Sequence, residues 1–430
     1  MTALIDLGEE HAPADDDPPG APRLSLWQRR GTALAVCVAL LVTSIAAERV
    51  PPGPLRGPVH VQDAVVGSVA LVDDLLLMAR RREDGTRDLA AVDTGDGSQR
   101  WRIPLAGGSP EVYAAWAADG VLLVSVIDGS SAEQAWSTYA VDRLTGVLYW
   151  QDRSIAVGTR IDGGQPVTLM VGVDPKADWF VSRDIRTGRE LWRVSYTTGQ
   201  DWSLYEVGGR IAGFVLVDMG ARRRVRLVGV DGTTQAEQDL PEGTDAVQQA
   251  DGALLVSYEH DGMHRITSLR LPDLEPGWNV PNPAPRSSVY VSDCRPSVCV
   301  NDGDLLWLLD AATGKVRWYG RMDGFFPAAP GVLNAGLHDT PGYSLLRDSG
   351  TGEVLMRLRD WQVVGYDGSL LLLSNQQDRR TWFGTFDPAH PGPVRVLGAG
   401  GPTLDRCWLT QGTLACRALL GGLDVYRYQP

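Results

Sequence analysis

The segment 89–101 of the chain, LAAVDTGDGSQRW, decides the fold, because its pattern returns along the sequence. An apolar run ends at Asp93, a glycine follows four residues later at Gly97, and a tryptophan follows eight residues later at Trp101. The same register recurs in three further sets, which are Asp142, Gly146 and Trp150; Asp184, Gly188 and Trp192; and Asp310, Gly314 and Trp318. Repetition at one fixed spacing indicates a chain built from copies of one structural unit.

Each residue of this repeat has a physical role in a turn between two strands. The Asp carboxylate can accept backbone N–H groups in the turn. The Gly supplies a positive φ. The Trp, on the next strand, offers a large apolar face that can pack against a neighbouring unit. Because an isolated unit cannot bury both of its faces, we expect the units to stack into a ring.

Weaker copies of the pattern lie between the strong ones. They contain Asp231; Asp273 with Trp278 displaced; Asp348 with Met356 in place of the tryptophan; and Asp387 with Gly392 one residue late. The spacing between successive Asp residues runs from 37 to 49 residues. Periods of this size are typical of propeller blades with four strands each.

The repeat resembles that of the quinoprotein alcohol dehydrogenase-like propellers, the pyrroloquinoline quinone (PQQ)-binding-like family of bacteria. Their unit reads roughly Ala-Leu-Asp-x-x-Thr-Gly-x-x-x-Trp, and three copies here have Thr-Gly at the turn, at Thr145-Gly146, Thr187-Gly188 and Thr313-Gly314. The resemblance covers about residues 60–430 and concerns structural positions. It implies an all-β fold, a β-propeller of four-stranded blades.

The number of blades depends on how the ends of the chain are counted. Eight Asp turns run from Asp93 to Asp387, and the piece from Cys407 to Tyr428 has room for three more strands. A strand around Val59-His60-Val61 could complete that last piece and close the ring with both ends of the chain. A literal count then gives nine blades, whereas the family precedent is eight. We therefore expect eight blades, with seven to nine possible.

The first 58 residues have a different composition from the rest. Residues 1–30 are acidic and Pro-rich, which predicts a disordered tail. Residues 31–47 are uncharged and long enough for one transmembrane helix, and Arg29-Arg30 before them predict a cytoplasmic N-terminus. A Pro/Gly-rich linker, 48–58, then leads to the propeller, 59–430, on the outer side of the cell membrane.

A cleaved signal peptide is the alternative interpretation of this segment. Ser44-Ile45-Ala46 fits a cleavage site, but the long acidic lead is unlike the short basic start of a signal peptide, so we favour the anchor. Cys37, inside the apolar run, is expected to be an inert apolar residue.

Four cysteines follow the apolar segment, in the pairs Cys294 and Cys299, and Cys407 and Cys416. Three pairings are possible. We favour the two local disulfides, because each pair brackets a turn signal and would join the first two strands of a blade. A site of four thiolates for a metal is the alternative, although the Cys-x-x-Cys spacing is absent.

The other candidate chemical sites in the sequence each have a structural interpretation. His260 and His264 flank Asp261-Gly262, which predicts a hairpin turn instead of a metal pair. Asp73-Asp74 is expected to solvate a turn. The net charge of −13 argues against a nucleic-acid partner. We predict no catalytic residue, no metal site and no cofactor.

The quinoprotein enzymes that the repeat resembles typically carry adjacent cysteines over the cofactor and a calcium ligand set. This chain has no Cys-Cys dipeptide. We therefore expect a non-catalytic, membrane-anchored binding or scaffolding propeller outside the cell, with a protein or cell-envelope partner. The alternative is a quinoprotein-like oxidoreductase that uses PQQ. We further hypothesise that a binding surface has diverged at the degenerate fourth and fifth repeats, around Asp231 and Asp273.

Overall fold

The computed structural model describes residues 55–61, 69–81, 86–105, 110–128, 135–162, 165–172, 178–196, 200–207, 210–220, 222–250, 252–283, 290–301, 305–322, 324–336, 344–419 and 421–429. The expected tail, the membrane helix, Cys37 and residues 48–54 of the linker lie outside these ranges. Within them, no helix has the length and apolar character needed to cross a bilayer.

Strands dominate the described residues, and they form antiparallel four-stranded sheets, which we call blades. Blade 1 contains β2 (Val69–Val72), β3 (Leu75–Arg81), β4 (Arg87–Asp93) and β5 (Gln99–Leu105). Blade 2 contains β6 (Pro110–Ala118), β7 (Val121–Asp128), β8 (Ala135–Asp142) and β9 (Leu148–Asp152). Blade 3 contains β10 (Ile155–Asp162), β11 (Gln165–Gly172), β12 (Asp178–Asp184) and β13 (Glu190–Tyr196). Blade 4 contains β14 (Asp201–Val207), β15 (Arg210–Asp218), β16 (Arg224–Gly229) and β17 (Thr234–Asp239).

The second half of the chain continues in the same way. Blade 5 contains β18 (Thr244–Ala250), β19 (Ala253–His260), β20 (Met263–Arg270) and β21 (Pro276–Pro281). Blade 6 contains β22 (Tyr290–Cys294), β23 (Ser297–Asn301), β24 (Leu305–Asp310) and β25 (Val316–Arg321). Blade 7 contains β26 (Phe325–Ala329), β27 (Val332–Gly336), β28 (Ser344–Asp348) and β29 (Val354–Leu358). Blade 8 contains β30 (Gln362–Tyr366), β31 (Leu371–Gln377), β32 (Arg380–Phe386) and β33 (Arg395–Gly400). Blade 9 contains β34 (Thr403–Thr410), β35 (Thr413–Ala418), β36 (Leu423–Tyr428) and β1 (Leu55–Val61).

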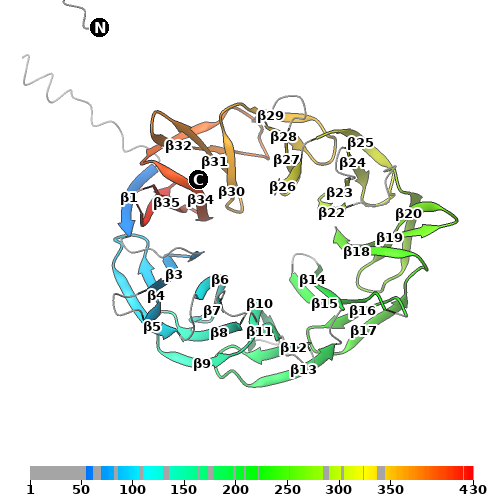
Figure 1. Ribbon diagram of the computed structural model, residues 1–430, viewed down its shortest axis with the longest axis horizontal. Coiled ribbons are helices and arrows are strands. Elements are labelled where there is room, and N and C mark those ends of the chain that lie inside the picture. Colours follow the sequence, from blue (N-terminus) through cyan, green and yellow to red (C-terminus); the bar gives the residue numbers. More distant parts are fainter. Residues whose placement is uncertain are drawn as a thin grey trace, which may run out of the picture. The chain divides into compact units, whose positions relative to one another are not determined.

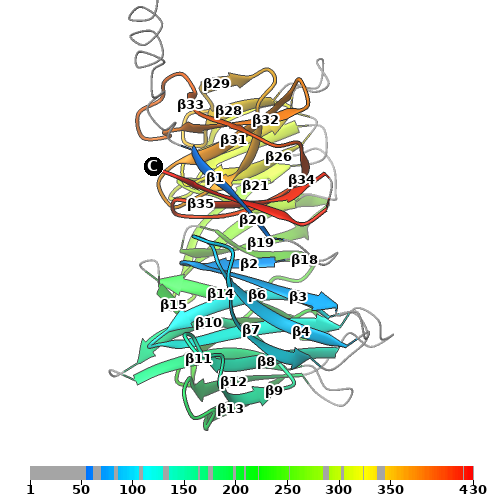
Figure 2. The same cartoon turned by 90° about the vertical axis from the view of Figure 1, so that its left-hand side faces the viewer.

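The blades of the unit Gly53–Pro430 follow one another around a ring, with the first strand of a blade innermost and the fourth outermost (Figure 1). The two ends of this unit meet in blade 9, where β1 pairs antiparallel with β36 and Val59 lies opposite Val425. Figure 2 shows the blue β1 among the red C-terminal strands. The expected closure of the ring by both ends is therefore confirmed. The strand begins at Leu55, so the predicted linker 48–58 runs into it.

The prediction of four-stranded propeller blades is confirmed, but the expected number of eight is wrong. The described residues form nine four-stranded sheets. The degenerate repeats around Asp231, Asp273 and Asp387 keep all four strands, because a backbone hydrogen-bond ladder does not require the motif side chains. The piece after Cys407 becomes a full ninth blade once β1 supplies its outer strand.

The hydrophobic core lies in the seams between neighbouring blades. In blade 1, the middle strands β3 and β4 are buried on both faces, with Leu77 and Leu89 fully shielded from solvent. Their side chains pack in one cluster with Leu122 and Tyr139 of blade 2. Because each blade shares a cluster with the next one, the ring and not the single blade is the unit that buries apolar surface.

Candidate functional site

The Asp of the repeat organises the turn between the third and fourth strands of a blade. One oxygen of Asp142 accepts the N–H of Leu144 at 3.0 Å, the N–H of Thr145 at 2.8 Å and the Thr145 hydroxyl at 2.8 Å. These donors, the Thr145 N–H first, hold the pKa of Asp142 below its ordinary value. Gly146 follows with a φ of +71°. Asp184, Asp310 and Asp348 accept the same pair of groups from Thr187, Thr313 and Thr351.

The Trp of the repeat binds to the turn of the following blade. The indole N–H of Trp101 donates to the carbonyl of Arg143 at 2.9 Å, and that of Trp150 donates to the carbonyl of Ile185 at 2.9 Å. The ring of Trp101 lies against Gly146, where an added Cβ would stand 2.6 Å from the indole. We call this contact the Trp–Gly clamp. In this clamp the repeat Trp packs against the next blade, and the repeat Gly provides the turn geometry that leaves room for the indole.

The other predicted repeat residues occupy related positions. Trp192 donates to the carbonyl of Val230 at 2.6 Å, and Trp318 lies against Gly352. Trp101 is buried, while Trp150, Trp192 and Trp318 are half-buried. At the closing seam, Gly97 meets Val59 of β1 in place of an indole. The motif residues are thus distributed around the ring, and each of these tryptophans contacts the turn of a different blade.

The fifth repeat has a different register from the one expected. Arg270 takes the Asp position, since its N–H donates to the carbonyl of Glu275 and its carbonyl accepts the N–H of Leu274, both at 2.8 Å. Leu274 takes the Gly position with a φ of +58°. Trp278 is then eight residues after the turn start and donates to the carbonyl of Ala311 at 2.7 Å. The expectation that Trp278 is displaced is wrong, because Asp273 lies inside the turn.

The fourth repeat departs from the pattern more strongly. Gly229 starts the turn, which is one residue shorter than the others, and Asp231 lies within it and accepts the N–H of Thr233 at 3.0 Å. Ala236 stands opposite Leu227, the place that a tryptophan occupies in blades 1, 2, 3 and 6. Ala236 and Leu274 belong to one apolar cluster. Between blades 4 and 5, the pair of Ala236 and Leu274 therefore replaces the Trp–Gly clamp.

The last two weak repeats follow the predicted pattern in part. Met356 stands opposite Leu346 at the tryptophan position of blade 7, as its spacing predicts. Asp387 accepts the N–H of Ala389 at 2.9 Å. Gly392 has no positive φ, so it does not have the role in the turn of blade 8 that Gly has in the strong repeats.

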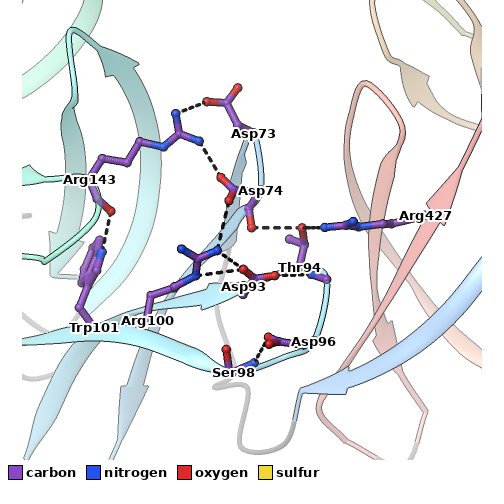
Figure 3. A network of polar contacts seen from close by, with 11 residues as sticks. Asp73, Asp74, Asp93, Thr94, Asp96, Ser98, Arg100, Trp101, Arg143 and Arg427 are labelled. Atoms are coloured by element: carbon purple, nitrogen blue, oxygen red, sulfur yellow. Dashed lines mark hydrogen bonds and ion pairs between the residues drawn. The ribbon is translucent and has the colours of Figure 1, made fainter.

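Asp73 and Asp74 do more than solvate a turn, contrary to expectation. Arg143 of blade 2 contacts Asp73 at 2.9 Å and Asp74 at 2.6 Å, and Arg100 reaches Asp74 at 3.5 Å (Figure 3). Arg100 also pairs with Asp93 of the turn. The carboxylates neutralise Arg143, which reaches across the seam from blade 2, so this acidic pair is part of the blade interface.

The other candidates from the sequence are also structural. Asp261 and Gly262, with φ of 51° and 72°, form the hairpin turn between β19 and β20. His260 lies opposite Met263 and His264 opposite Glu259, so the imidazoles do not form a cross-strand pair. The part of the chain that the structure describes contains no cluster of three metal-ligating side chains.

Both predicted disulfides are confirmed. Cys294 and Cys299 join β22 to β23 with a Cα–Cα distance of 5.6 Å. Cys407 and Cys416 stand directly opposite each other on β34 and β35, with a Cα–Cα distance of 4.1 Å. Each bond joins the first two strands of its blade, and the alternative site of four thiolates is excluded because these sulfurs are used.

A groove of about 740 Å³ lies along the inner strands of blades 4, 5 and 6. All residues of β14 except Tyr205 line it, together with residues 247–249 of β18 and Ser292 and Asp293 of β22. Tyr205 itself is fully buried. The groove therefore follows the whole length of an inner strand, beside a seam without the Trp–Gly clamp.

Only some of the charged groups of the groove are ion-paired. Asp293 pairs with Arg295 at 2.8 Å. Within the described ranges, Asp201 and Glu206 have no ion pair, and both are exposed. The lining therefore holds three carboxylates and one guanidinium, a net charge of −2. The side-chain oxygen of Gln249 is buried without a hydrogen-bond partner among the described residues.

These groove residues could not be found from any motif. Asp201, Glu206 and Gln249 lie on inner strands, whereas the repeat pattern covers the third and fourth strands of each blade. The only signal in the sequence was indirect, namely the loss of the pattern around Asp231 and Asp273. The groove lies at those blades and at blade 6.

No protein-family model and no curated protein matches the chain. Solved structures with a similar fold include BamB from Moraxella catarrhalis, with 13% identity, a TM-score of 0.41, and coverage of 87% of this chain and 99% of that one. They also include the dihydro-heme d1 dehydrogenase NirN, with 15% identity, a TM-score of 0.43, and coverage of 80% and 78%. The exotype rhamnogalacturonan lyase YesX has 14% identity, a TM-score of 0.43, and coverage of 88% and 91%. Similarity at this level concerns the β-propeller fold and does not choose among functions.

Proposed function

We propose that the protein is a non-catalytic binding or scaffolding propeller whose ligand site is the groove of blades 4, 5 and 6. One observation carries this proposal. The seam between blades 4 and 5 lacks the Trp–Gly clamp, and the inner strands β14 and β18 of these two blades line the groove. Its volume of about 740 Å³ lies within the range of ligand sites in proteins.

The binding role can be tested with a photo-cross-linking amino acid at Ser203, which lines the groove and is exposed. The matched control places the same amino acid at Tyr319, which is 65% exposed on the outer strand β25. We expect an adduct of one defined mass in living cells at Ser203 and none at Tyr319. Equal labelling at both positions, or labelling at neither, contradicts the groove as a ligand site.

We further propose that residues 31–47 anchor the propeller at the outer side of the cell membrane. The support is the uncharged run with Arg29-Arg30 on its N-terminal side. Protease added to intact cells should digest residues 60–430 and spare the N-terminal tail. Protection of the whole chain would show that the propeller lies inside the cell.

The absence of catalysis is the part of the proposal that a cofactor assay can overturn. The Asp, Gly and Trp of each repeat are engaged in turns and seams, which explains them without a cofactor. Calorimetric titration of the protein with PQQ and calcium, followed by a dye-linked alcohol dehydrogenase assay, should show neither binding nor turnover. Stoichiometric binding with turnover would establish the quinoprotein-like oxidoreductase instead.

A further inference from the structure

We infer that the groove binds an extended, basic polypeptide segment that adds a strand to the free edge of β14. This inference rests on the proposed function, because it names the ligand class of the same site. Two independent features of the groove support it, namely its backbone edge and its charge.

The backbone edge comes from the position of β14 in its sheet. Blade 4 has the strand order β14-β15-β16-β17, so one side of β14 pairs with β15 and the other side has no strand partner among the described residues. Such an edge presents N–H and C=O groups that an extended peptide can pair with. At a rise of about 3.3 Å per residue, a seven-residue strand offers an edge of roughly 20 Å. A partner segment of about six or seven residues fits that length.

The charge of the groove selects basic side chains on that segment. Asp201 and Glu206 stand at the two ends of β14, five positions apart, and both are exposed. The one guanidinium of the lining, that of Arg295, is already paired with Asp293. Opposite charges across an interface fix the register of a bound segment. We therefore expect two Lys or Arg residues about five positions apart.

A saccharide fits these observations less well. Trp202 is the aromatic residue of the lining that could stack on a sugar ring. Its ring instead contacts Phe180 edge-to-face, with 5.5 Å between ring centroids, and also approaches Phe214. Part of the indole therefore packs in the seam between blades 3 and 4, and the residue is 36% exposed.

The test is calorimetric titration of the full chain, in mild detergent, with the capped peptide Lys-Thr-Val-Thr-Val-Lys-Thr. We expect saturable binding that weakens as salt is raised. A peptide with Glu in place of both Lys, and one N-methylated at alternate backbone amides, should bind at least tenfold more weakly. Equal binding of the N-methylated peptide would overturn strand addition, and equal binding of the acidic peptide would overturn the charge argument.

The matched protein variants separate groove binding from general attraction to an acidic protein. Asp201→Asn with Glu206→Gln should weaken the basic peptide at least tenfold. Glu259→Gln with Asp261→Asn removes two exposed carboxylates at the β19–β20 hairpin and should leave affinity unchanged. Equal effects of the two double variants would overturn the inference.

The cross-link at Ser203 distinguishes a wrong ligand class from a wrong site. A Ser203 adduct identified as a saccharide or lipid, together with no peptide binding, would overturn this inference and leave the proposed function standing. No adduct and no peptide binding would overturn both.

Discussion

At the scale of single residues, the stability of the ring depends on how a few side chains dock across seams. Trp101 is 5% exposed and contacts both the carbonyl of Arg143 and the face of Gly146. Trp101→Ala should lower the free energy of unfolding by about 3–5 kcal/mol, because it removes a large buried aromatic and leaves a cavity. Urea denaturation measures the loss.

The control for this substitution is Tyr319→Ala, because Tyr319 is also an aromatic residue of an outer strand but is 65% exposed. Its loss should change the free energy of unfolding by about 0.5 kcal/mol or less. Similar losses of unfolding free energy in the two variants would show that burial in the seam is not what makes Trp101 stabilising.

The turn carboxylates make stability depend on pH. Hydrogen bonds from the N–H of Thr145, then from the Thr145 and Tyr149 hydroxyls, lower the pKa of Asp142. A lowered folded pKa gives stability that is present above the unfolded value of about 3.9 and is lost as pH falls through the folded pKa. Asp142→Asn should therefore have a lower urea midpoint than the natural protein at pH 7, and the difference should shrink below about pH 4. A difference that stays constant from pH 7 to pH 3 contradicts this explanation.

At the scale of elements, each disulfide constrains one β-hairpin. Cys407 and Cys416 close a loop of about ten residues between β34 and β35. Loop-closure entropy for that length amounts to about 2–3 kcal/mol, so Cys407→Ser with Cys416→Ser should lower the free energy of unfolding by that amount. Cys37→Ser is the control and should have no effect, since Cys37 is predicted to be unpaired. A loss with Cys37→Ser would show that this cysteine has a structural partner.

At the scale of the whole molecule, closure of the ring depends on β1. Val59 and Val61 contribute to an apolar cluster that joins blade 9 to blade 1. A chain that begins at residue 62 should be less stable than one that begins at residue 53. A peptide of residues 53–62 should restore about 2.7 kcal/mol when added at a hundred times its dissociation constant. Thermal denaturation measures both effects.

The control for ring closure is the same peptide with Val59→Lys and Val61→Lys, which keeps the backbone but removes the apolar face. It should fail to restore stability. Equal stability of the chains starting at 53 and 62 would show that blade 9 holds with three strands.

The sequence by itself determined the blade type, the turn chemistry of the strong repeats and the local disulfides. These features depend on residues close together in the chain, such as Asp142, Thr145 and Gly146, or on cysteines that bracket one turn. Spacing along the sequence is then enough to predict contact in space, since the strands of one hairpin are necessarily neighbours.

Only the tertiary structure decided the blade number, the register of the fifth repeat and the groove. Blade 9 exists because β1 meets β36 from the far end of the chain. Leu274 occupies the Gly position of the fifth repeat. It fits there because Ala236, at the Trp position of the preceding blade, is small and packs in the same cluster. The groove depends on inner strands of three blades. Each of these features combines residues distant in sequence, and only the packing of the blades against one another brings them together.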